Sequence, residues 1–245
     1  NISKVIKLFD KIDLTDVKEI VIKGTDEIML ILNGNIDSKM VINLLKDYVS
    51  TIVLNDKIIY GNDYINIKVG NYNYAVYPKS FFQINTCMID KLYDKVLEFA
   101  GSGKRLLDLY CGAGTIGIYL ASNFECVDGI EVNSDAVEGA NLNKKINNIS
   151  NISFECKRAN ELTNTNYDVI VVDPPRAGLD SVTIGKLLDS KSDKIVYVSC
   201  NPITLARDIK LLSDKYEVCD ITLFDMFPNT KHVESVVKLI NREKV

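Results

Sequence analysis

The chain has 245 residues, of which 47% are hydrophobic and 25% are charged, so its composition is that of a globular protein with material for one or two cores. No apolar run approaches the roughly 20 residues that a membrane-spanning helix needs, and we expect a cytoplasmic protein without a membrane partner. The net charge of −4 argues mildly against a broad basic surface for phosphate groups.

The six cysteines show no C-x-x-C spacing, so we expect no zinc or iron–sulfur site and no other metal in this chain. A disulfide framework is also not expected, because no secretory signal is present. The chain begins at Asn1 without an initiator methionine, which is compatible with a fragment of a longer protein as well as with a family member that has no further domains.

Residues 1–85 are rich in strand signals and predict a small α+β subdomain. Two short strands are expected over 18–23 and 27–33, and a hairpin is expected around the turn at Gly70 and Asn71. Apolar residues at helical spacing predict a helix over 39–49.

Residues 86–245 alternate strand and helix patterns, which predicts an α/β domain with a Rossmann-like, seven-stranded sheet. The expected strands are 105–109, 126–130, 152–155, 168–172, 194–199, 217–224 and 233–241. The expected helices include 115–121, 134–146 and 203–212. The last two strands are joined by a loop too short for a crossover helix, so they should form an antiparallel pair at the sheet edge.

A glycine-rich turn follows the first of these strands. Gly112, Gly114 and Gly117 match G-x-G-x-x-G, and Glu131 ends the next strand, where an acidic ligand of a ribose is expected. The pattern fits both a nicotinamide dinucleotide and S-adenosyl-L-methionine. Asp108 favours S-adenosyl-L-methionine, because a carboxylate ahead of the glycines would repel a pyrophosphate and attract an ammonium group.

Two further strands end in reactive side chains. The apolar run 169–172 stops at Asp173, which two prolines follow, and the run 194–199 stops at Cys200. Ligands of parallel sheets bind beyond the carboxyl ends of the strands. Pro202 is placed to open a helix, whose N-terminus would favour a thiolate. We therefore interpret Cys200 as a nucleophile rather than an inert buried cysteine.

Five motifs in this order resemble the RNA uracil-5 methyltransferase family, a class I S-adenosyl-L-methionine-dependent family, and are most similar to its bacterial 23S ribosomal RNA members. The resemblance runs from about residue 18 to the C-terminus. The motifs are Ser80–Asn85, Asp108–Gly114, Asp173–Arg176, Ser199–Pro202 and Phe227–Glu234.

The resemblance implies the roles of individual residues. Cys200 would add to C6 of a uracil, C5 would then accept the methyl group, and Glu234 would remove the C5 proton. His232, the single histidine, is an alternative base but is more suited to positioning the loop. The implied cofactor-binding residues are Gln83, Tyr110, Glu131 and Asp173, with Phe81, Thr115 and Asn160 as weaker candidates.

The resemblance also implies an RNA partner, with 23S ribosomal RNA favoured over transfer RNA, and a monomeric enzyme. Many family members carry an oligonucleotide-binding barrel and a four-cysteine iron–sulfur cluster, and neither pattern is visible in this sequence. The alternatives are a transfer RNA uridine-5 methyltransferase, an NAD-dependent oxidoreductase and a non-catalytic RNA-binding module.

Overall fold

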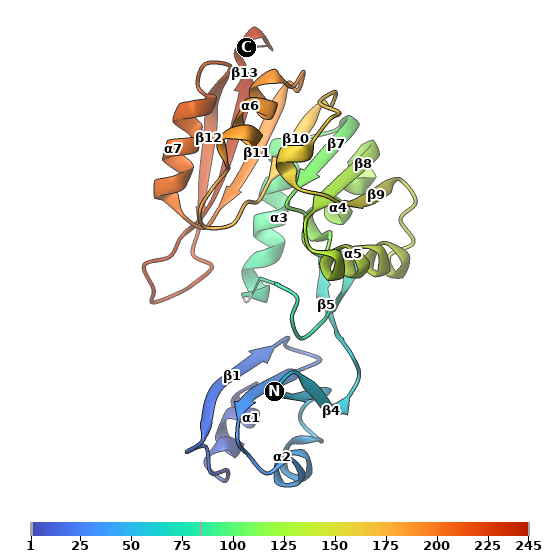
Figure 1. Cartoon of the computed structure of the whole chain (residues 1–245), viewed down its shortest axis with the longest axis vertical. Coiled ribbons are helices and arrows are strands. Elements are labelled where there is room, and N and C mark those ends of the chain that lie inside the picture. The colour runs from blue at the N-terminus through green and yellow to red at the C-terminus, as the bar shows by residue number, and fades with distance from the viewer. Residues whose placement is uncertain (1, 84, 245) are drawn as a thin grey trace. The chain divides into compact units, whose positions relative to one another are not determined.

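The computed structural model describes residues 2–83 and 85–244, which fall into two units, Asn1–Thr86 and Cys87–Val245 (Figure 1). The sequence places the division after residue 85, next to the end of the first unit. Within the described part of the chain, no helix combines the length and the apolar character that a membrane crossing requires.

The first unit is built on a mixed four-stranded sheet in the order β1-β2-β3-β4, in which the central pair β2 and β3 is parallel. Its strands are β1 (Val17–Lys23), β2 (Met29–Gly34), β3 (Thr51–Leu54) and β4 (Lys57–Gly61). The other elements are helices α1 (Ile2–Phe9) and α2 (Ser38–Leu45) and the hairpin β5 (Ile65–Val69) and β6 (Tyr72–Val76).

Apolar side chains of this sheet and its two helices form one core. Leu30 and Leu32 of β2 belong to the same buried cluster as Val5 of α1 and Val41 and Leu45 of α2. The predicted hairpin and the first two strands are present, whereas the predicted helix 39–49 ends earlier, at Leu45. Helix α1 and strands β3 and β4 were not predicted, because such short elements carry little periodic signal.

The second unit contains a seven-stranded sheet in the order β12-β13-β11-β10-β7-β8-β9, which confirms the predicted α/β fold class. The strands are β7 (Gly103–Leu109), β8 (Phe124–Glu131), β9 (Ile152–Cys156), β10 (Val169–Val172), β11 (Lys194–Ser199), β12 (Tyr216–Phe224) and β13 (Glu234–Asn241). Strands β7 to β11 pair in parallel, and β13 pairs antiparallel with both β11 and β12.

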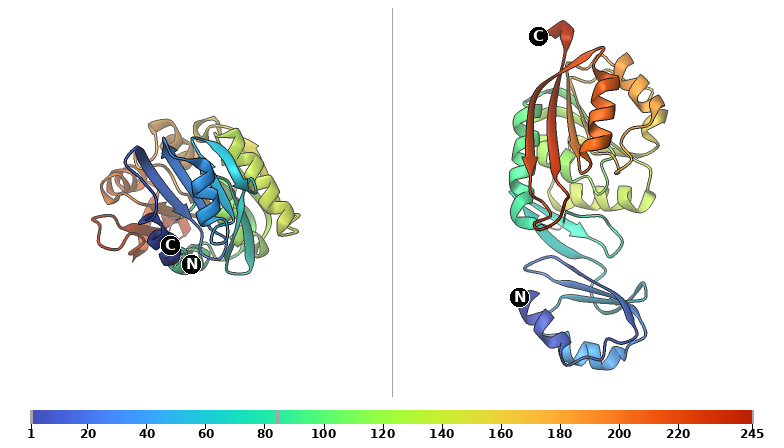
Figure 2. Two further views of the ribbon diagram at one scale, coloured as in Figure 1. Left: turned by 90° about the horizontal axis from the view of Figure 1, so that it is seen from below. Right: turned by 90° about the vertical axis from the view of Figure 1, so that its left-hand side faces the viewer.

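Helices cover both faces of this sheet, as its buried central strands require. The α-helices are α3 (Thr86–Ala100), α4 (Thr115–Leu120), α5 (Ser134–Ile146), α6 (Ser181–Asp189) and α7 (Pro202–Leu212), and the 3₁₀ turns are η1 (Ala121–Asn123), η2 (Ala159–Glu161) and η3 (Arg242–Lys244). Figure 2 shows α7 and α3 on opposite faces of the sheet. Apolar residues of α6 and α7, including Ile184 and Leu205, share a buried cluster with Leu107, Ile170 and Tyr197 of the strands.

The direction of β13 decides which residues meet at the carboxyl edge of the sheet. Parallel strands β7, β8, β10 and β11 all end at that edge. Because β13 runs the opposite way, it begins there, and Ser199 at the end of β11 pairs with Ser235 near the start of β13. The residues that follow β10 and β11 are therefore neighbours of the residue that opens β13.

Candidate active site

Cys200 and Glu234 are brought together by the register of β11 and β13. Ser199 pairs with Ser235, so the next pair in this register is Cys200 with Glu234. Glu234 is buried, with 2% of its surface exposed, and Cys200 is partly buried. The predicted nucleophile and the predicted base therefore face one another at the carboxyl edge of the sheet.

Asp173 adds a second carboxyl group to this edge. It follows β10, the neighbour of β11, and its backbone N–H donates a hydrogen bond to the carbonyl of Leu109 at 3.3 Å. Burial raises the pKa of Asp173 to about 7. Burial, with the Asp173 charge as a second cause, raises the pKa of Glu234 to about 8. Both carboxyl groups thus have access to the protonated form near neutral pH.

The Cys200 thiol has a raised pKa, caused first by burial and then by the negative charge of Glu234. The Arg176 guanidinium, in hydrogen-bonding contact with the thiol, opposes this and lowers the pKa. The expectation that the helix N-terminus lowers the thiol pKa is therefore wrong for the net effect in the free protein. Burial and the neighbouring carboxylate outweigh the lowering effect of Arg176, so the pKa of the thiol is raised.

Arg176 also contacts His232. Its Nη2 lies 2.6 Å from Nδ1 and 3.1 Å from Nε2 of the imidazole. The ring of His232 stands edge-on to Phe227, with ring centroids 6.1 Å apart, so the loop between β12 and β13 is ordered partly by its own aromatic contact. In this arrangement His232 contacts the arginine that touches the thiol, which is a positioning contact.

Backbone N–H groups of the glycine loop after β7 donate hydrogen bonds to residues at the end of β8. The N–H of Cys111 donates to the Ile130 carbonyl at 3.1 Å, and the N–H of Gly112 donates to Glu131 Oε2 at 3.1 Å. The other oxygen of Glu131 accepts from the N–H of Asn133 at 2.9 Å. Gly112 has φ of +53°, and a Cβ there would meet nothing within 4 Å, so the loop has open space above it.

Asp108 lies under this loop and supports the start of α4. Its Oδ2 accepts a hydrogen bond from the N–H of Gly117 at 2.8 Å. Its Oδ1 is buried and has no hydrogen-bond partner within the part of the chain that the structure describes. Burial raises the pKa of Asp108 to about 7. A buried, unsatisfied carboxyl oxygen beside an open glycine loop fits a ligand that carries hydrogen-bond donors or a positive charge.

Tyr110 and Glu131, two predicted cofactor residues, line one pocket of about 170 Å³ together with the weaker candidate Asn160. Sequence reasoning missed Lys157, Arg158 and Asp180, which also line it. Tyr110 has φ of +63°, a conformation rare for residues other than glycine. Burial raises the pKa of its phenol, and a hydrogen bond with Thr183 lowers it. Asp173 is not among the residues that line this pocket.

The remaining predicted residues divide between the two units. Thr115, the first residue of α4, accepts a hydrogen bond from the buried Tyr93 hydroxyl at 2.8 Å. Gln83 and Phe81 belong to the first unit: Gln83 is buried, and Phe81 is 76% exposed. Among the described residues, Gln83 Oε1 has no hydrogen-bond partner, which is consistent with a ligand-binding role.

Within residues 2–83 and 85–244, no group of three or more His, Cys, Asp or Glu side chains is arranged to hold a metal ion.

Comparisons with known proteins agree on one family. The family model described as tRNA (Uracil-5-)-methyltransferase matches residues 32–166 and 153–242. A protein of Oceanobacillus iheyensis named as an uncharacterized RNA methyltransferase is 41% identical over 212 residues, which are 82% of this chain and 46% of that protein. A Bacillus cereus protein of the same name is 38% identical over 201 residues, or 78% of this chain and 44% of its own length. The chain thus spans about half the length of these relatives.

A solved structure supports the same assignment. The Pyrococcus abyssi tRNA (uracil-54, C5)-methyltransferase, in complex with S-adenosyl-L-homocysteine, superposes with a TM-score of 0.83 and 33% identity, over 98% of this chain and 66% of that chain. The M. jannaschii tRNA m1G37 methyltransferase matches with a TM-score of 0.66 at 16% identity, over 93% of this chain and 76% of that chain, which shows similarity of fold alone. These findings overturn the alternative of an NAD-dependent oxidoreductase. The chain belongs to the tRNA (uracil-5-)-methyltransferase family.

Proposed function

We propose that the protein transfers a methyl group from S-adenosyl-L-methionine to C5 of a uridine in RNA, through a covalent bond between Cys200 and C6 of the base. The observation that carries the proposal is that Cys200 and Glu234 each lie next to the pair formed by Ser199 and Ser235, where β11 ends and β13 begins. The proposed reaction needs a nucleophile and a base, and the Cys200 thiol and the Glu234 carboxyl group can supply them, while Arg176 favours the thiolate by lowering the thiol pKa.

The residues around the glycine loop fit the cofactor. Tyr110 and Glu131 line a pocket beside the loop, and the free Oδ1 of Asp108 and the carboxyl group of Asp173 are suited to a positively charged ligand. Gln83 is a further proposed ligand, as the family resemblance implies. S-adenosyl-L-methionine supplies an electrophilic methyl group when it is bound.

Cys200 solves the problem that C5 of uracil is a poor nucleophile. Its thiolate adds to C6, and the electron pair of the C5–C6 double bond moves toward the O4 carbonyl, which makes C5 nucleophilic enough to accept the methyl group. The Arg176 guanidinium stabilises the thiolate by its charge, against the effect of burial. A uridine inside a helical stack has to be turned outward for this attack.

Glu234 completes the reaction as the base. After methylation, C5 carries both a methyl group and a proton. The Glu234 carboxylate takes the proton, the C5–C6 double bond re-forms, and the thiolate of Cys200 leaves. Because the pKa of Glu234 in the free protein is about 8, this group has to lose its proton before it can act.

The RNA substrate is the finer part of the proposal. The family resemblance alone favours 23S ribosomal RNA, whereas the P. abyssi relative is a tRNA (uracil-54, C5)-methyltransferase. We propose ribosomal RNA, and transfer RNA is the alternative that the relative supports. The monomeric state and the cytoplasmic location stay predictions.

A methylation assay tests the reaction and the substrate together. The protein is incubated with S-adenosyl-L-methionine and either transfer RNA or 23S ribosomal RNA transcripts, and 5-methyluridine is measured by mass spectrometry of the nucleosides. The Cys200→Ala variant should form none, whereas Cys219→Ala, which changes an exposed cysteine, should match the unaltered protein. A Cys200→Ala variant that still methylates RNA would sink the mechanism, and 5-methyluridine found in transfer RNA alone would decide against ribosomal RNA.

A further inference from the structure

Helix α7 carries a buried carboxylate that the proposed reaction does not use directly. Asp208 has no exposed surface. Its Oδ2 accepts hydrogen bonds from the Leu179 N–H at 2.8 Å and from the Tyr197 hydroxyl at 2.7 Å, and its Oδ1 accepts one from Arg207 Nε at 2.8 Å. Burying a charged carboxylate is costly unless the carboxylate is paired, and these hydrogen bonds supply the pairing. The contacts that Asp208 makes therefore indicate its role.

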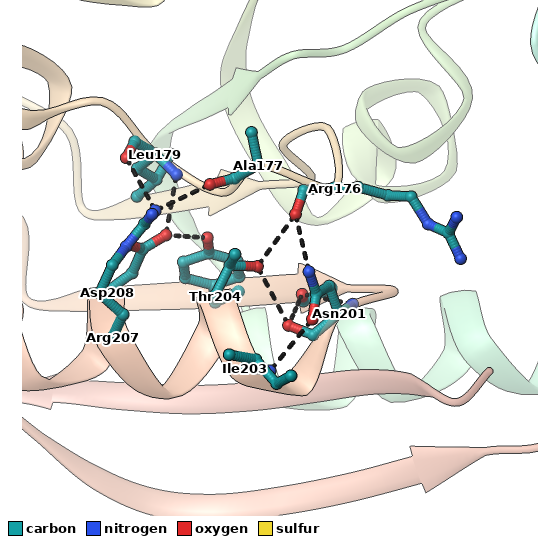
Figure 3. Close-up of polar contacts among 10 residues, drawn as sticks. Arg176, Ala177, Leu179, Asn201, Ile203, Thr204, Arg207 and Asp208 are labelled. Atoms are coloured by element: carbon teal, nitrogen blue, oxygen red, sulfur yellow. Dashed lines mark hydrogen bonds and ion pairs between the residues drawn. The ribbon is translucent and has the colours of Figure 1, made fainter. Parts of the chain in front are cut away.

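The group that Asp208 and its neighbours hold is the segment 176–179, which follows the prolines after β10. Arg207 Nη2 donates to the carbonyls of Ala177 at 2.8 Å and Leu179 at 3.2 Å. The carbonyl of Arg176 accepts from Asn201 Nδ2 at 3.0 Å and from Thr204 Oγ1 at 3.2 Å. Figure 3 shows these backbone groups facing the side chains of the first turns of α7.

Gly178 shows how closely the segment fits against α7. Its φ is +76°, and a Cβ at this position would lie 2.4 Å from Asp208 Oδ2 and 2.7 Å from Arg207 Nη2. There is no room for a side chain between the segment and the helix. The backbone of 176–179 therefore packs directly against the side chains of Arg207 and Asp208.

Segment 176–179 is linked to Cys200 in two ways, through the start of α7 and through the side chain of Arg176. Helix α7 begins at Pro202, two residues after Cys200, and Asn201 caps it by accepting from the N–H of Ile203 at 3.1 Å. The Arg176 side chain, at the other end of the same set of bonds, is in contact with the Cys200 thiol and with His232. Anything that displaces 176–179 on α7 displaces the guanidinium relative to the thiol.

We propose that Asp208, assisted by Arg207, is a positioning residue that fixes segment 176–179 on α7 and so holds the Arg176 guanidinium against the Cys200 thiol. The inference rests on the proposed function, in which Cys200 is the nucleophile. The hydrogen bonds of Asp208 go to Leu179, Tyr197 and Arg207, so its proposed effect on the thiol runs through Arg176. Replacing Asp208 should therefore change the pH dependence of the reactivity of the Cys200 thiol, and not only the stability of the fold.

The reactivity of Cys200 toward iodoacetamide gives a direct reading. The folded protein is alkylated between pH 6 and 10, and the rate at Cys200 is followed by mass spectrometry of its peptide. The midpoint is the pH at which the alkylation rate of Cys200 reaches half its maximum. Removing a cation next to a thiol raises the thiol pKa, so Arg176→Ala should move this midpoint upward by about one pH unit. Asp208→Asn should move it upward by at least about half a unit. Asp214→Asn, an exposed aspartate just beyond the same helix, should not move it.

The double variant Arg176→Ala/Asp208→Asn separates positioning from a general structural effect. If Asp208 acts through Arg176, the midpoint of the double variant equals that of Arg176→Ala alone. The proposal would be overturned if the shifts of the two single variants added in the double variant. It would also be overturned by an unshifted midpoint in folded Asp208→Asn or in Arg176→Ala.

Arg207→Ala keeps the test decisive if Asp208→Asn does not fold. The Arg207 side chain is half exposed, and its removal deletes the bonds to Ala177 and Leu179. It should shift the Cys200 midpoint upward, and a folded Arg207→Ala protein with the midpoint of the unaltered protein would also refute the inference. Alkylation needs no RNA and no methyl transfer, so failure of the proposed function shows separately, as an absence of RNA methylation by the unaltered protein.

Discussion

Glu234 has two opposing effects on the reaction at the scale of single residues. Its carboxylate raises the pKa of the Cys200 thiol, which weakens the nucleophile, yet the carboxylate is also the proposed base. Burial raises the pKa of Glu234 itself to about 8. The free protein therefore holds both groups mostly protonated at neutral pH, and the active form has to be reached by loss of protons.

Glu234→Gln separates the two effects. The variant lacks the negative charge opposite Cys200, so the thiol pKa should fall and alkylation of Cys200 at pH 9 should become faster than in the unaltered protein. Methyl transfer should nevertheless fall by about 10²–10⁴-fold, because the base is absent. Glu125→Gln, at an exposed position of β8, is the matched control. Slower alkylation in Glu234→Gln would contradict the electrostatic coupling of the two groups.

The rate of methyl transfer should rise with pH. In the proposed reaction Glu234 acts as a carboxylate, and because its folded-state pKa is about 8, its ionised fraction increases between pH 6 and pH 9. Single-turnover rates measured over this range, at saturating RNA and cofactor, should climb by roughly tenfold or more. A flat profile between pH 6 and pH 8 would show that the base ionises at lower pH in the complex.

At the scale of elements, the glycine loop depends on a contact from α5. The buried Asn143 donates through Nδ2 to the carbonyl of Ala113 at 3.0 Å. The loop is therefore held both by Glu131 at the end of β8 and by a helix that packs beside it.

Asn143→Ala should loosen this loop. It leaves a buried carbonyl unpaired and should lower the free energy of unfolding by about 1–3 kcal/mol, and it should weaken cofactor binding measured by calorimetry. Asn141→Ala is the control on the same helix, because the side chain of Asn141 donates its hydrogen bond to the Val137 carbonyl within α5. Equal affinity in the two variants would show that Asn143 does not support the cofactor loop.

The strand ends were predictable from the sequence, whereas the contacts behind them were not. Apolar runs that stop at Asp173 and Cys200 locate both residues at the sheet edge, and the short loop before β13 places Glu234 beside them. The upward shift of the thiol pKa depends on burial and on a carboxylate from another strand, and neither is visible in the local sequence pattern. Asp208 had one usable signal: it occupies the apolar face of α7 together with Leu205 and Leu212.

At the scale of the whole molecule, the second unit contains three carboxyl groups whose pKa values are raised by burial: Asp108, Asp173 and Glu234. A carboxyl group with a raised folded-state pKa favours the folded state when it is protonated. This contribution is complete below the unfolded pKa near 4 and is lost as pH rises through about 7 to 8.

The second unit should therefore be less stable at pH 8.5 than at pH 5.5 when no ligand is bound. Each kcal/mol lost corresponds to about 2–4 °C in melting temperature for a protein of this size. Calorimetric scans of the protein and of Asp108→Asn should show a smaller pH dependence in the variant. A melting temperature that rises from pH 5.5 to pH 8.5 would mean that these carboxyl groups are not held in their protonated form.

The covalent bond between Cys200 and C6 is the central step of the proposed reaction, and a suicide substrate tests it most directly. RNA containing 5-fluorouridine cannot lose fluorine from C5 as it would lose a proton, so methylation should trap the RNA on Cys200. The unaltered protein, with S-adenosyl-L-methionine, should yield a denaturation-resistant complex whose linked peptide contains Cys200, and Cys200→Ala should yield none. A complex that persists in Cys200→Ala, or a link that maps to another cysteine, would contradict it.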